Sequence, residues 1–479
     1  MKIALVHYHL QPGGVTRVIE NTIQAWKKSR SCPEQLVVLS GRPYSGKVIQ
    51  QVQVVEGLDY TDTNSVIDPK LLKQRMEDAA ISTLGELPDV WHIHNHSLGK
   101  NPGLSGAVAE LAHSGAHLLL QPHDFAEDGR PDNFSNLGDT RSLLYPTGAH
   151  IHYAVLNRRD QVFLQTIMAE LPSPVHLLAN AIPDTPETKE KSSSSLQYIP
   201  DNLFLYPVRA VRRKNLGELV LLAMSYPEFH FANSLGPTNP SFLPLYQSWI
   251  EYAREHELAV TFGLGECSDI TFAEMVNHAK SIINVSVAEG FGLGFLEPWT
   301  FRKSLCGRNL SEITSDFSDL GVKLDHMYEE LFIDPCFIDL QELRNTIYQS
   351  LRNTYCQYQK EIPDNAIDRA TESIASPEGV KFGRLNENMQ KDIIHRIKSS
   401  RDSIASIRQQ AKLEILNDAE IDSNRSAVNE NFSLSEYGNK VFDLYQDLVN
   451  HPSERVSFAD GNQMLEQFLC PERFNLLRA

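Results

Sequence analysis

The feature that most constrains the fold of this chain is a regular alternation of short apolar segments with segments of helical periodicity. In the first part of the sequence, five segments have the length and apolar character of buried strands, and two have the spacing of amphipathic helices. The strand-like segments are 2–7, 35–39, 89–94, 117–121 and 151–156, and the helical ones are 15–28 and 104–113. Strands that alternate with helices predict a doubly wound, parallel α/β sheet.

The alternation stops at one polar stretch and then starts again. Residues 184–197, DTPETKEKSSSSLQ, hold no apolar residue before Leu196, which is typical of a linker. Beyond it, strand-like segments at 203–208, 230–233, 260–263 and 281–285 alternate with helical ones at 216–224, 246–256 and 271–279. We therefore expect two Rossmann-like domains, residues 1–184 and 198–430, that face a central cleft.

The last third of the chain has a different character. Residues 318–400 are polar and irregular, and we expect helices at 340–357 and 386–408 with little sheet. Residues 433–448 have a strongly amphipathic pattern, and Ser433 is of a type preferred at helix N-caps. We expect a separate C-terminal segment, 431–479, made of this helix and a tail.

Composition agrees with a chain of several domains and argues against several classes of protein. The 479 residues correspond to two or three domains of about 100–200 residues. The longest apolar run, 219–224, is far short of the ~20 residues that span a membrane, and the N-terminus lacks the pattern of a signal peptide. A net charge of −17 argues against a general nucleic-acid binder or an enzyme docked on anionic lipid. Six scattered cysteines without a C-x-x-C motif suit the cytoplasm and give no zinc signature.

Two segments of the second half have residue types suited to binding an anion and the hydroxyl groups of a ligand. RAVRRKN (209–215) follows a strand-like segment directly and carries four cations. EGFGLGFLE (289–297) follows another and combines three glycines with two carboxylates eight positions apart. In doubly wound sheets, ligands bind outside the carboxyl ends of the strands. Cations there neutralise a diphosphate, and carboxylates accept hydrogen bonds from sugar or ribose hydroxyls. A solvated charge run and a glycine-rich turn are the structural alternatives.

The first half has weaker signals at equivalent places. Gly13 and Gly14 stand between the first strand and the first helix, where a ligand can approach the backbone or where the chain simply turns. His123 and Asp124 follow the segment HLLLQP, and His123 is suited to donating to a sugar or to acid–base work. The histidines of HIHNHS (92–97) resemble a metal cluster. Without an acidic ligand nearby in sequence, packing or contact with an acceptor is the favoured interpretation.

Taken in order, these motifs resemble those of the retaining glycosyltransferases of family GT4, which have the GT-B fold. The resemblance covers most of residues 1–317 and resumes at 430–448. The matching elements are Pro12-Gly13-Gly14-Val15, His123-Asp124, Asn180-Ala181-Ile182-Pro183, Arg209 with Lys214, and Glu289 with Glu297 around Phe291-Gly292. Val208 and Ala181 depart from the family's glycines, residues 301–314 (FRKSLCGRNLSEIT) replace its apolar strand, and 318–400 looks like a mostly helical insertion.

The resemblance implies roles for individual residues. Glu297 would hold the nucleotide ribose, Arg209 and Lys214 the diphosphate, and Glu289 with the loop amides the donor sugar. The implied catalytic set is His123, Arg209, Lys214 and Glu289. The implied donor-binding set is Gly13, Gly14, Arg209, Lys214, Glu289, Phe291, Gly292, Leu293 and Glu297, with His94 and Asp124 on the acceptor side. The late helix would cross back to the first domain.

The implied activity is transfer of a hexose from a nucleotide sugar to an acceptor hydroxyl on the face from which the diphosphate leaves. The expected donor is a UDP-, GDP- or ADP-hexose, with no cofactor required and Mg²⁺ possible but not indicated. The negative net charge of the chain favours a small soluble acceptor, such as a hydroxy acid or a sugar. Two alternatives stay open: a GT-B phosphorylase that uses inorganic phosphate, and a catalytically silent GT-B scaffold.

Overall fold

The computed structural model describes residues 1–29, 31–61, 65–183, 199–266 and 270–478. The chain forms two compact units. The first comprises Met1–Pro183, Cys356–Lys360 and Glu430–Cys470, and the second comprises Asp184–Tyr355, Glu361–Asn429 and Pro471–Ala479. The linker expected at 184–197 lies outside the described residues.

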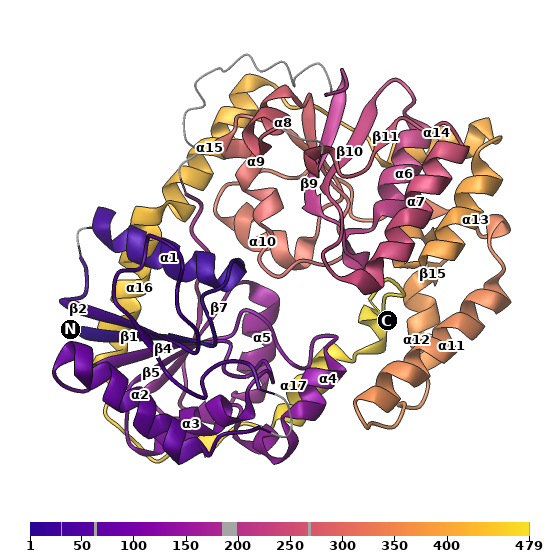
Figure 1. Ribbon diagram of the computed structural model, residues 1–479. Coiled ribbons are helices and arrows are strands. Elements are labelled where there is room, and N and C mark those ends of the chain that lie inside the picture. The colour runs from indigo at the N-terminus through magenta and orange to yellow at the C-terminus, as the bar shows by residue number, and fades with distance from the viewer. Residues whose placement is uncertain (30, 62–64, 184–198, 267–269, 479) are drawn as a thin grey trace. The chain divides into compact units, whose positions relative to one another are not determined.

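The first unit is built on a seven-stranded parallel sheet (Figure 1). Its strand order is β3-β2-β1-β4-β5-β7-β8. The strands are β1 (Lys2–His7), β2 (Gln35–Ser40), β3 (Val52–Val54), β4 (Val90–His94), β5 (Leu118–Gln121), β7 (Ile151–Val155) and β8 (Val175–Leu177). The main helices are α1 (Gly14–Lys28), α2 (Pro69–Leu84), α3 (Pro102–His113), α5 (Arg158–Ile167), α16 (Leu434–Val449) and α17 (Gly461–Phe468). All five strands and both helices expected in this part of the chain are confirmed.

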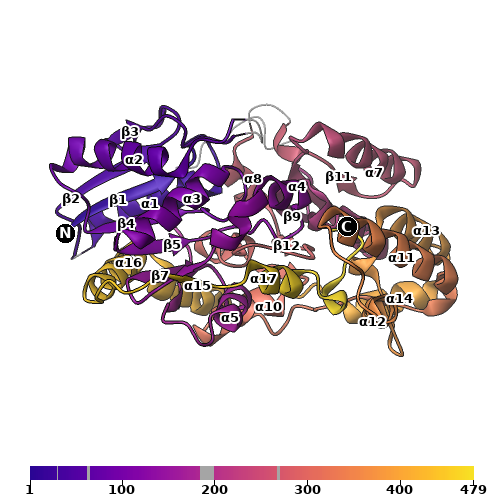
Figure 2. The same ribbon diagram turned by 90° about the horizontal axis from the view of Figure 1, so that it is seen from below.

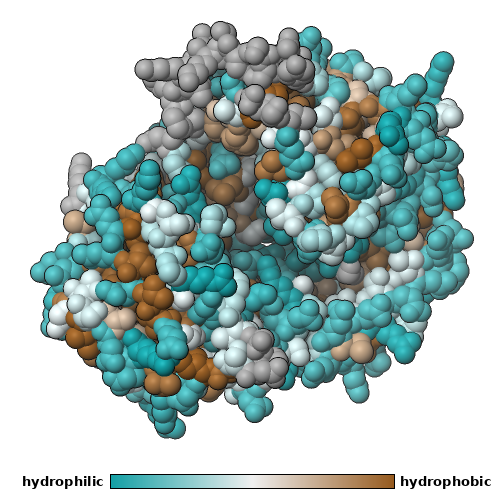
Figure 3. Space-filling model, in the orientation of Figure 1, coloured by the Kyte–Doolittle hydropathy of each residue, from teal (hydrophilic) through white to brown (hydrophobic). Residues whose placement is uncertain are grey.

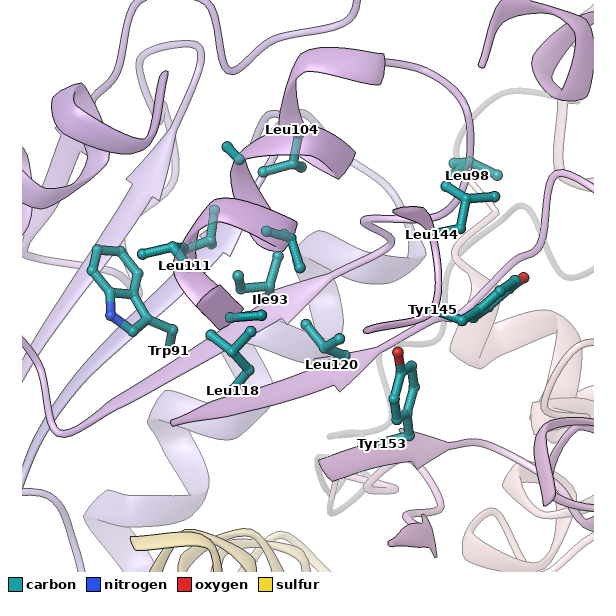
Figure 4. Close-up of a cluster of buried hydrophobic side chains, with 14 of the residues drawn as sticks. Trp91, Ile93, Leu98, Leu104, Leu111, Leu118, Leu120, Leu144, Tyr145 and Tyr153 are labelled. Carbon is teal, nitrogen blue, oxygen red and sulfur yellow. The ribbon is translucent and has the colours of Figure 1, made fainter. Parts of the chain in front are cut away.

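The strands of this sheet are apolar throughout because both faces are buried. In β1, Ala4 and Val6 pack into a core with α2 and α3, whereas Ile3 and Leu5 pack into a second core with α1 and α16. Figure 4 shows part of the first core, where leucines of α3 lie over Ile93 and Leu120. The late helix α16 lies beside this sheet (Figures 1 and 2). It begins as expected at Ser433, whose Oγ accepts a hydrogen bond from Glu436 N at 3.3 Å.

The second unit has a five-stranded parallel sheet with the order β11-β10-β9-β12-β13. The strands are β9 (Leu203–Arg209), β10 (His230–Leu235), β11 (Val260–Thr261), β12 (Ser281–Asn284) and β13 (Leu305–Gly307). The helices around it include α6 (Leu216–Ser225), α7 (Leu243–Glu255), α8 (Phe272–His278), α9 (Glu297–Thr300) and α10 (Ser311–Asp319). The expected strands and helices of this half are confirmed, and β13 shows that residues 301–314 keep a strand despite their unusual sequence. Both units are thus Rossmann-like.

The segment after α10 differs from the expectation at one helix. The expected helix at 386–408 is two helices, α13 (Glu387–Ile397) and α14 (Arg401–Gln410), because Ser400 caps the second one by accepting from Ser403 N at 3.2 Å. The little sheet expected here is a small antiparallel one, β14-β16-β15, from Phe332–Ile333, Gly379–Lys381 and Ala375–Ser376. The helix expected at 340–357 is present as α11 (Leu340–Gln357), followed by α12 (Ala366–Ile374) and later α15 (Asp418–Phe432).

Hydrophilic residues cover much of the face that Figure 3 shows, with separate apolar patches among them. Within the described residues, no helix has the length and apolar character needed to cross a bilayer.

Candidate active site

The two charged segments of the second unit meet at the carboxyl edge of its sheet. Strands β9 and β12 are hydrogen-bonded neighbours, so the loops that follow them leave the sheet side by side. A backbone hydrogen bond of 2.9 Å from Val287 N to Arg213 O ties the two loops together. This is the edge where doubly wound domains bind ligands.

Lys214 and Glu289 form an ion pair across these loops. Their side chains are only 14% and 13% exposed. Ser286 Oγ donates to Glu289 Oε1 at 2.6 Å, and Tyr206 OH lies 2.5 Å from Ser286 Oγ. Because the serine proton goes to the carboxylate, the tyrosine must be the donor in that second bond. A chain of three groups therefore orients Glu289 toward Lys214.

Ser286 and Tyr206 were not among the residues expected from the sequence. Ser286 stands three positions before Glu289, immediately beyond β12, and that spacing is the one sequence signal for its role. Tyr206 is fully buried in β9, where its ring is indistinguishable from core packing in the sequence alone.

The loop that carries Lys214 is braced by buried polar groups. Asn215 adopts a left-handed conformation with φ 51° at the start of α6. Its side chain donates to Glu218 Oε2 at 2.9 Å and accepts from Gln390 Nε2 at 2.9 Å. Glu218 in turn binds Arg308 through two guanidinium nitrogens, and both side chains are almost fully buried. A buried ion pair thus fixes the turn that presents Lys214.

The other cations of this loop have different surroundings. Arg209 lies at the exposed end of β9, and its Nη1 donates to Gly236 O at 3.1 Å. Arg212 is engaged by both oxygens of Glu387, at 2.9 and 3.1 Å, and therefore serves the structure of the unit. Arg213 is exposed. Of the four cations in the motif, Arg209 and Lys214 are the two that the resemblance assigns to ligand binding, and Arg212 is the one that the structure engages elsewhere.

The loop after β12 folds as a tight turn into α9. Gly292 has φ +90° and begins the short 3₁₀ helix Leu293–Phe295, which leads into Glu297 at the first position of α9. The Phe291 ring is buried against Phe317, with ring centroids 5.4 Å apart, so its backbone is the part suited to a ligand. Leu293 is 40% exposed.

At the carboxyl edge of the first sheet, the expected histidines come together. His94 ends β4, and its Nδ1 lies 2.9 Å from Nε2 of His123, just beyond β5. Asn95, with φ 57°, accepts hydrogen bonds from the backbone N–H groups of His123 and Asp124, at 2.6 and 3.1 Å. Asp124 pairs with Arg130 at 2.5 Å. His123 is thus held through both its backbone and its ring.

Both imidazoles are neutral at physiological pH. Burial, reinforced by the nearby imidazoles of His7 and His92, lowers the pKa of His123 to about 3. Burial also holds the pKa of His94 well below its ordinary value. A neutral imidazole donates or accepts a hydrogen bond at pH 7 but supplies no positive charge.

The neighbouring histidines have structural partners. Nδ1 of His92 lies 2.7 Å from Tyr445 OH and its Nε2 lies 2.9 Å from Gln121 Oε1. Nε2 of His96 lies 2.9 Å from Leu144 O. These bonds agree with the packing interpretation of HIHNHS rather than with a shared metal.

The glycine pair of the first unit lies at the N-terminus of α1, where Gly13 is the N-cap. Both residues are exposed. An added Cβ would meet nothing within 4 Å at Gly14 and only Gln11 O at 3.8 Å at Gly13, and neither backbone needs glycine's left-handed region. The fold of this unit by itself therefore does not require glycine at either position.

Known proteins similar to this chain share its fold. No protein-family model matches the sequence. The chain is 23% identical, over an alignment of 504 positions, to mannosylglucosyl-3-phosphoglycerate synthase of Petrotoga mobilis, covering 99% of this chain and 96% of that protein. The structure resembles HepE of Anabaena, solved with UDP and glucose, with a TM-score of 0.53, 10% identity and coverage of 93% and 99%.

Sucrose-phosphate synthase of Thermosynechococcus elongatus is similar as well, with a TM-score of 0.51, 13% identity and coverage of 94% and 99%. The chain is a GT-B glycosyltransferase. This glycosyltransferase is similar to family GT4, as its motifs predicted, and its two Rossmann-like sheets are those of the GT-B fold.

Proposed function

We propose that this glycosyltransferase transfers a hexose from a nucleoside diphosphate sugar to a hydroxyl of a small anionic acceptor, with retention of the anomeric configuration. The observation that carries the proposal is the largely buried Lys214–Glu289 pair at the carboxyl edge of the second sheet. A cation and an oriented carboxylate at this place suit a sugar diphosphate, because the cation binds phosphate and the carboxylate binds sugar hydroxyls.

We assign the donor to the second unit. Arg209 and Lys214 bind the diphosphate, Glu297 binds the ribose, and Glu289 with the backbone of Phe291, Gly292 and Leu293 positions the hexose. HepE, which shares the fold, has been solved with UDP-glucose, and this supports a nucleotide sugar as the donor. We expect this donor to be a UDP-, GDP- or ADP-hexose.

The transfer needs no strong protein base. The acceptor O–H bond breaks as its oxygen bonds to the anomeric carbon, the bond from that carbon to the diphosphate oxygen breaks, and the leaving diphosphate takes the proton. Lys214 stabilises the charge that grows on the diphosphate, which is electrostatic catalysis by a pre-positioned group. His123, neutral at pH 7, positions a hydroxyl by hydrogen bonding.

An anionic acceptor is supported by the first unit and by the comparison. Beyond His94 and Asp124, the Tyr60 ring packs on His9, with centroids 4.6 Å apart, and lies under the Lys100 ammonium at 5.6 Å. The name of the Petrotoga relative contains a phosphoglycerate unit, whose phosphate and carboxylate would suit Lys100. We propose an acceptor of this class.

The proposal is tested by following the product with proton NMR. The protein is incubated with each of the three nucleotide hexoses and with 3-phosphoglycerate or its glucoside. The expected primary product keeps the anomeric configuration of the donor. An inverted primary product would rule out the retaining, front-face course.

Gly14→Ala separates ligand contact from folding. We expect an unchanged melting temperature, because the Cβ has open space, together with a lower kcat/KM, because a ligand that approaches the bare backbone meets the new methyl group. The matched variant is Gly292→Ala, at a position where the backbone does favour glycine. The φ of +90° at Gly292 makes alanine destabilise the fold by about 1–2 kcal/mol. The added Cβ would also lie 3.1 Å from side-chain atoms of Ile313 and Phe295. A Gly14→Ala enzyme with full activity would show that no substrate contacts this glycine.

A further inference from the structure

A second cluster of histidine and carboxylate groups lies in the first unit, apart from the residues assigned to transfer. It consists of His152 on β7 and of Asp447 and His451 at the end of α16. One nitrogen or carboxylate oxygen from each of the three lies within 4.8 Å of those of the others. Nδ1 of His152 is 3.9 Å from Asp447 Oδ2, and the rings of His152 and His451 are 5.0 Å apart.

A third imidazole borders this cluster from the next strand. His176 of β8 pairs in register with Ala154 of β7. Ala154 lies two residues after His152 on the same strand. Side chains alternate along a strand, so His152 and His176 project from the same face. Nε2 of His176 lies 3.1 Å from Nδ1 of His152. His176 therefore borders the three-residue cluster where β7, β8 and the end of α16 meet.

The ring of His451 is oriented in the manner of a ligand. Its Nδ1 lies 2.9 Å from the backbone oxygen of Asp447. A neutral imidazole that donates from Nδ1 keeps its lone pair on Nε2. Histidines that bind metals commonly donate their other ring N–H to a carbonyl or carboxylate in this way. The helix end thus presets the tautomer that binding requires.

His152 is buried without full satisfaction of its ring. Its side chain is 0% exposed. Its Nδ1 is the nitrogen near His176 and Asp447, and among the described residues its Nε2 has no hydrogen-bond partner. Asp447, whose side chain is 53% exposed, keeps a path to solvent.

The two separations measured from His152 are near those of a tetrahedral site. Zinc–nitrogen bonds of about 2.0–2.1 Å in a tetrahedron place ligand atoms about 3.3–3.4 Å apart. The measured separations of 3.1 Å, from His152 to His176, and 3.9 Å, from His152 to Asp447, lie on either side of this value. Imidazoles with one carboxylate are ligands that suit Zn²⁺.

We propose that His152, His176, His451 and Asp447 bind one Zn²⁺, which fastens the end of α16 to strands β7 and β8. The two strands and the helix end are almost 300 residues apart in the sequence, so the ion links the C-terminal helix to the sheet that it covers. The site is independent of glycosyl transfer and acts on the stability of the first unit.

Zinc binding by the full-length protein, first stripped with a chelator, tests the proposal. Calorimetric titration with Zn²⁺ is expected to show one ion per chain and a rise in melting temperature. Asp447→Asn and His451→Gln should each weaken Zn²⁺ binding at least tenfold. Loss of a residue that only supports a metal ligand already lowers metal affinity by about 10–100-fold. Their melting temperatures without metal should stay near that of the wild type, because neither side chain is in a core.

His395→Gln is the matched control, because His395 pairs with another histidine, His256, on the surface of the second unit, with ring centroids 5.9 Å apart. It should bind Zn²⁺ as the wild type does. Substitution by Co²⁺ should give the visible absorption of a four-coordinate ion, absent in Asp447→Asn. Equal Zn²⁺ affinity in all four proteins, or no saturable binding of one equivalent, would overturn the proposal.

Discussion

Lys214→Ala is expected to lower kcat by about 10²–10³, the usual effect of removing a group that stabilises transition-state charge. The Lys214 ammonium is already held by Glu289 and largely shielded from solvent, so water screens its charge only weakly. Charge on the diphosphate grows as the sugar leaves, and an interaction that strengthens in the transition state appears in kcat.

Two variants make this result specific. Glu297→Gln should mainly raise the donor KM, because ribose is bound equally in the ground and transition states. Arg213→Ala removes an exposed cation next to Lys214 and should leave kcat near that of the wild type. The measurement is a donor-saturation curve at saturating acceptor for each enzyme. If Lys214→Ala reaches the wild-type rate once donor is raised, the role assigned to Lys214 is wrong.

Arg308→Met is expected to destabilise the second unit by about 3–5 kcal/mol, the cost of leaving one partner of a buried ion pair unpaired. Arg308 and Glu218 are 2% and 0% exposed. Glu218 also accepts from Tyr328 OH at 2.8 Å and from Asn215 Nδ2 at 2.9 Å. Removing the guanidinium leaves the Glu218 carboxylate buried with only neutral hydrogen-bond donors. The substitution therefore also loosens the turn that presents Lys214.

The matched control is Arg344→Met. The Arg344–Asp368 pair in the same unit is 43% and 52% exposed, and such surface pairs contribute about 0–1 kcal/mol. Urea unfolding of both variants gives the comparison. Equal shifts of the unfolding midpoint would contradict the bracing role of the Glu218–Arg308 pair.

The sequence predicted the sheets well because their strands are buried on both faces and their apolar runs are continuous. It also placed Lys214 and Glu289 directly after strands of the second half, and the structure brings the two together because parallel strands end at one edge of the sheet. The break between α13 and α14 was missed because the cap, Ser400, looks like any polar surface residue in the pattern SSRDS. The periodicity of a helical sequence does not show whether a serine caps a new helix or simply faces solvent.

The supports of the site were not predictable for a different reason. Ser286 and Tyr206 are 80 residues apart, and Glu218 and Arg308 are 90 apart, so their contacts depend on how the strands and helices pack. Glu218 within the apolar segment LGELVLLAMS does signal a buried charge, but nothing in that segment names its partner. Site residues at strand ends follow from topology, whereas the groups that orient them follow from packing.

The measurement that tests the central claim most directly is a product balance on the purified protein with a nucleotide hexose and 3-phosphoglycerate or its glucoside. We predict that the wild type releases one nucleoside diphosphate for each new glycoside, detected by mass spectrometry, and that Lys214→Ala does so about 10²–10³ times more slowly. Release of a sugar phosphate that depends on added inorganic phosphate, with no nucleoside diphosphate formed from any donor, would contradict the claim and identify a phosphorylase instead.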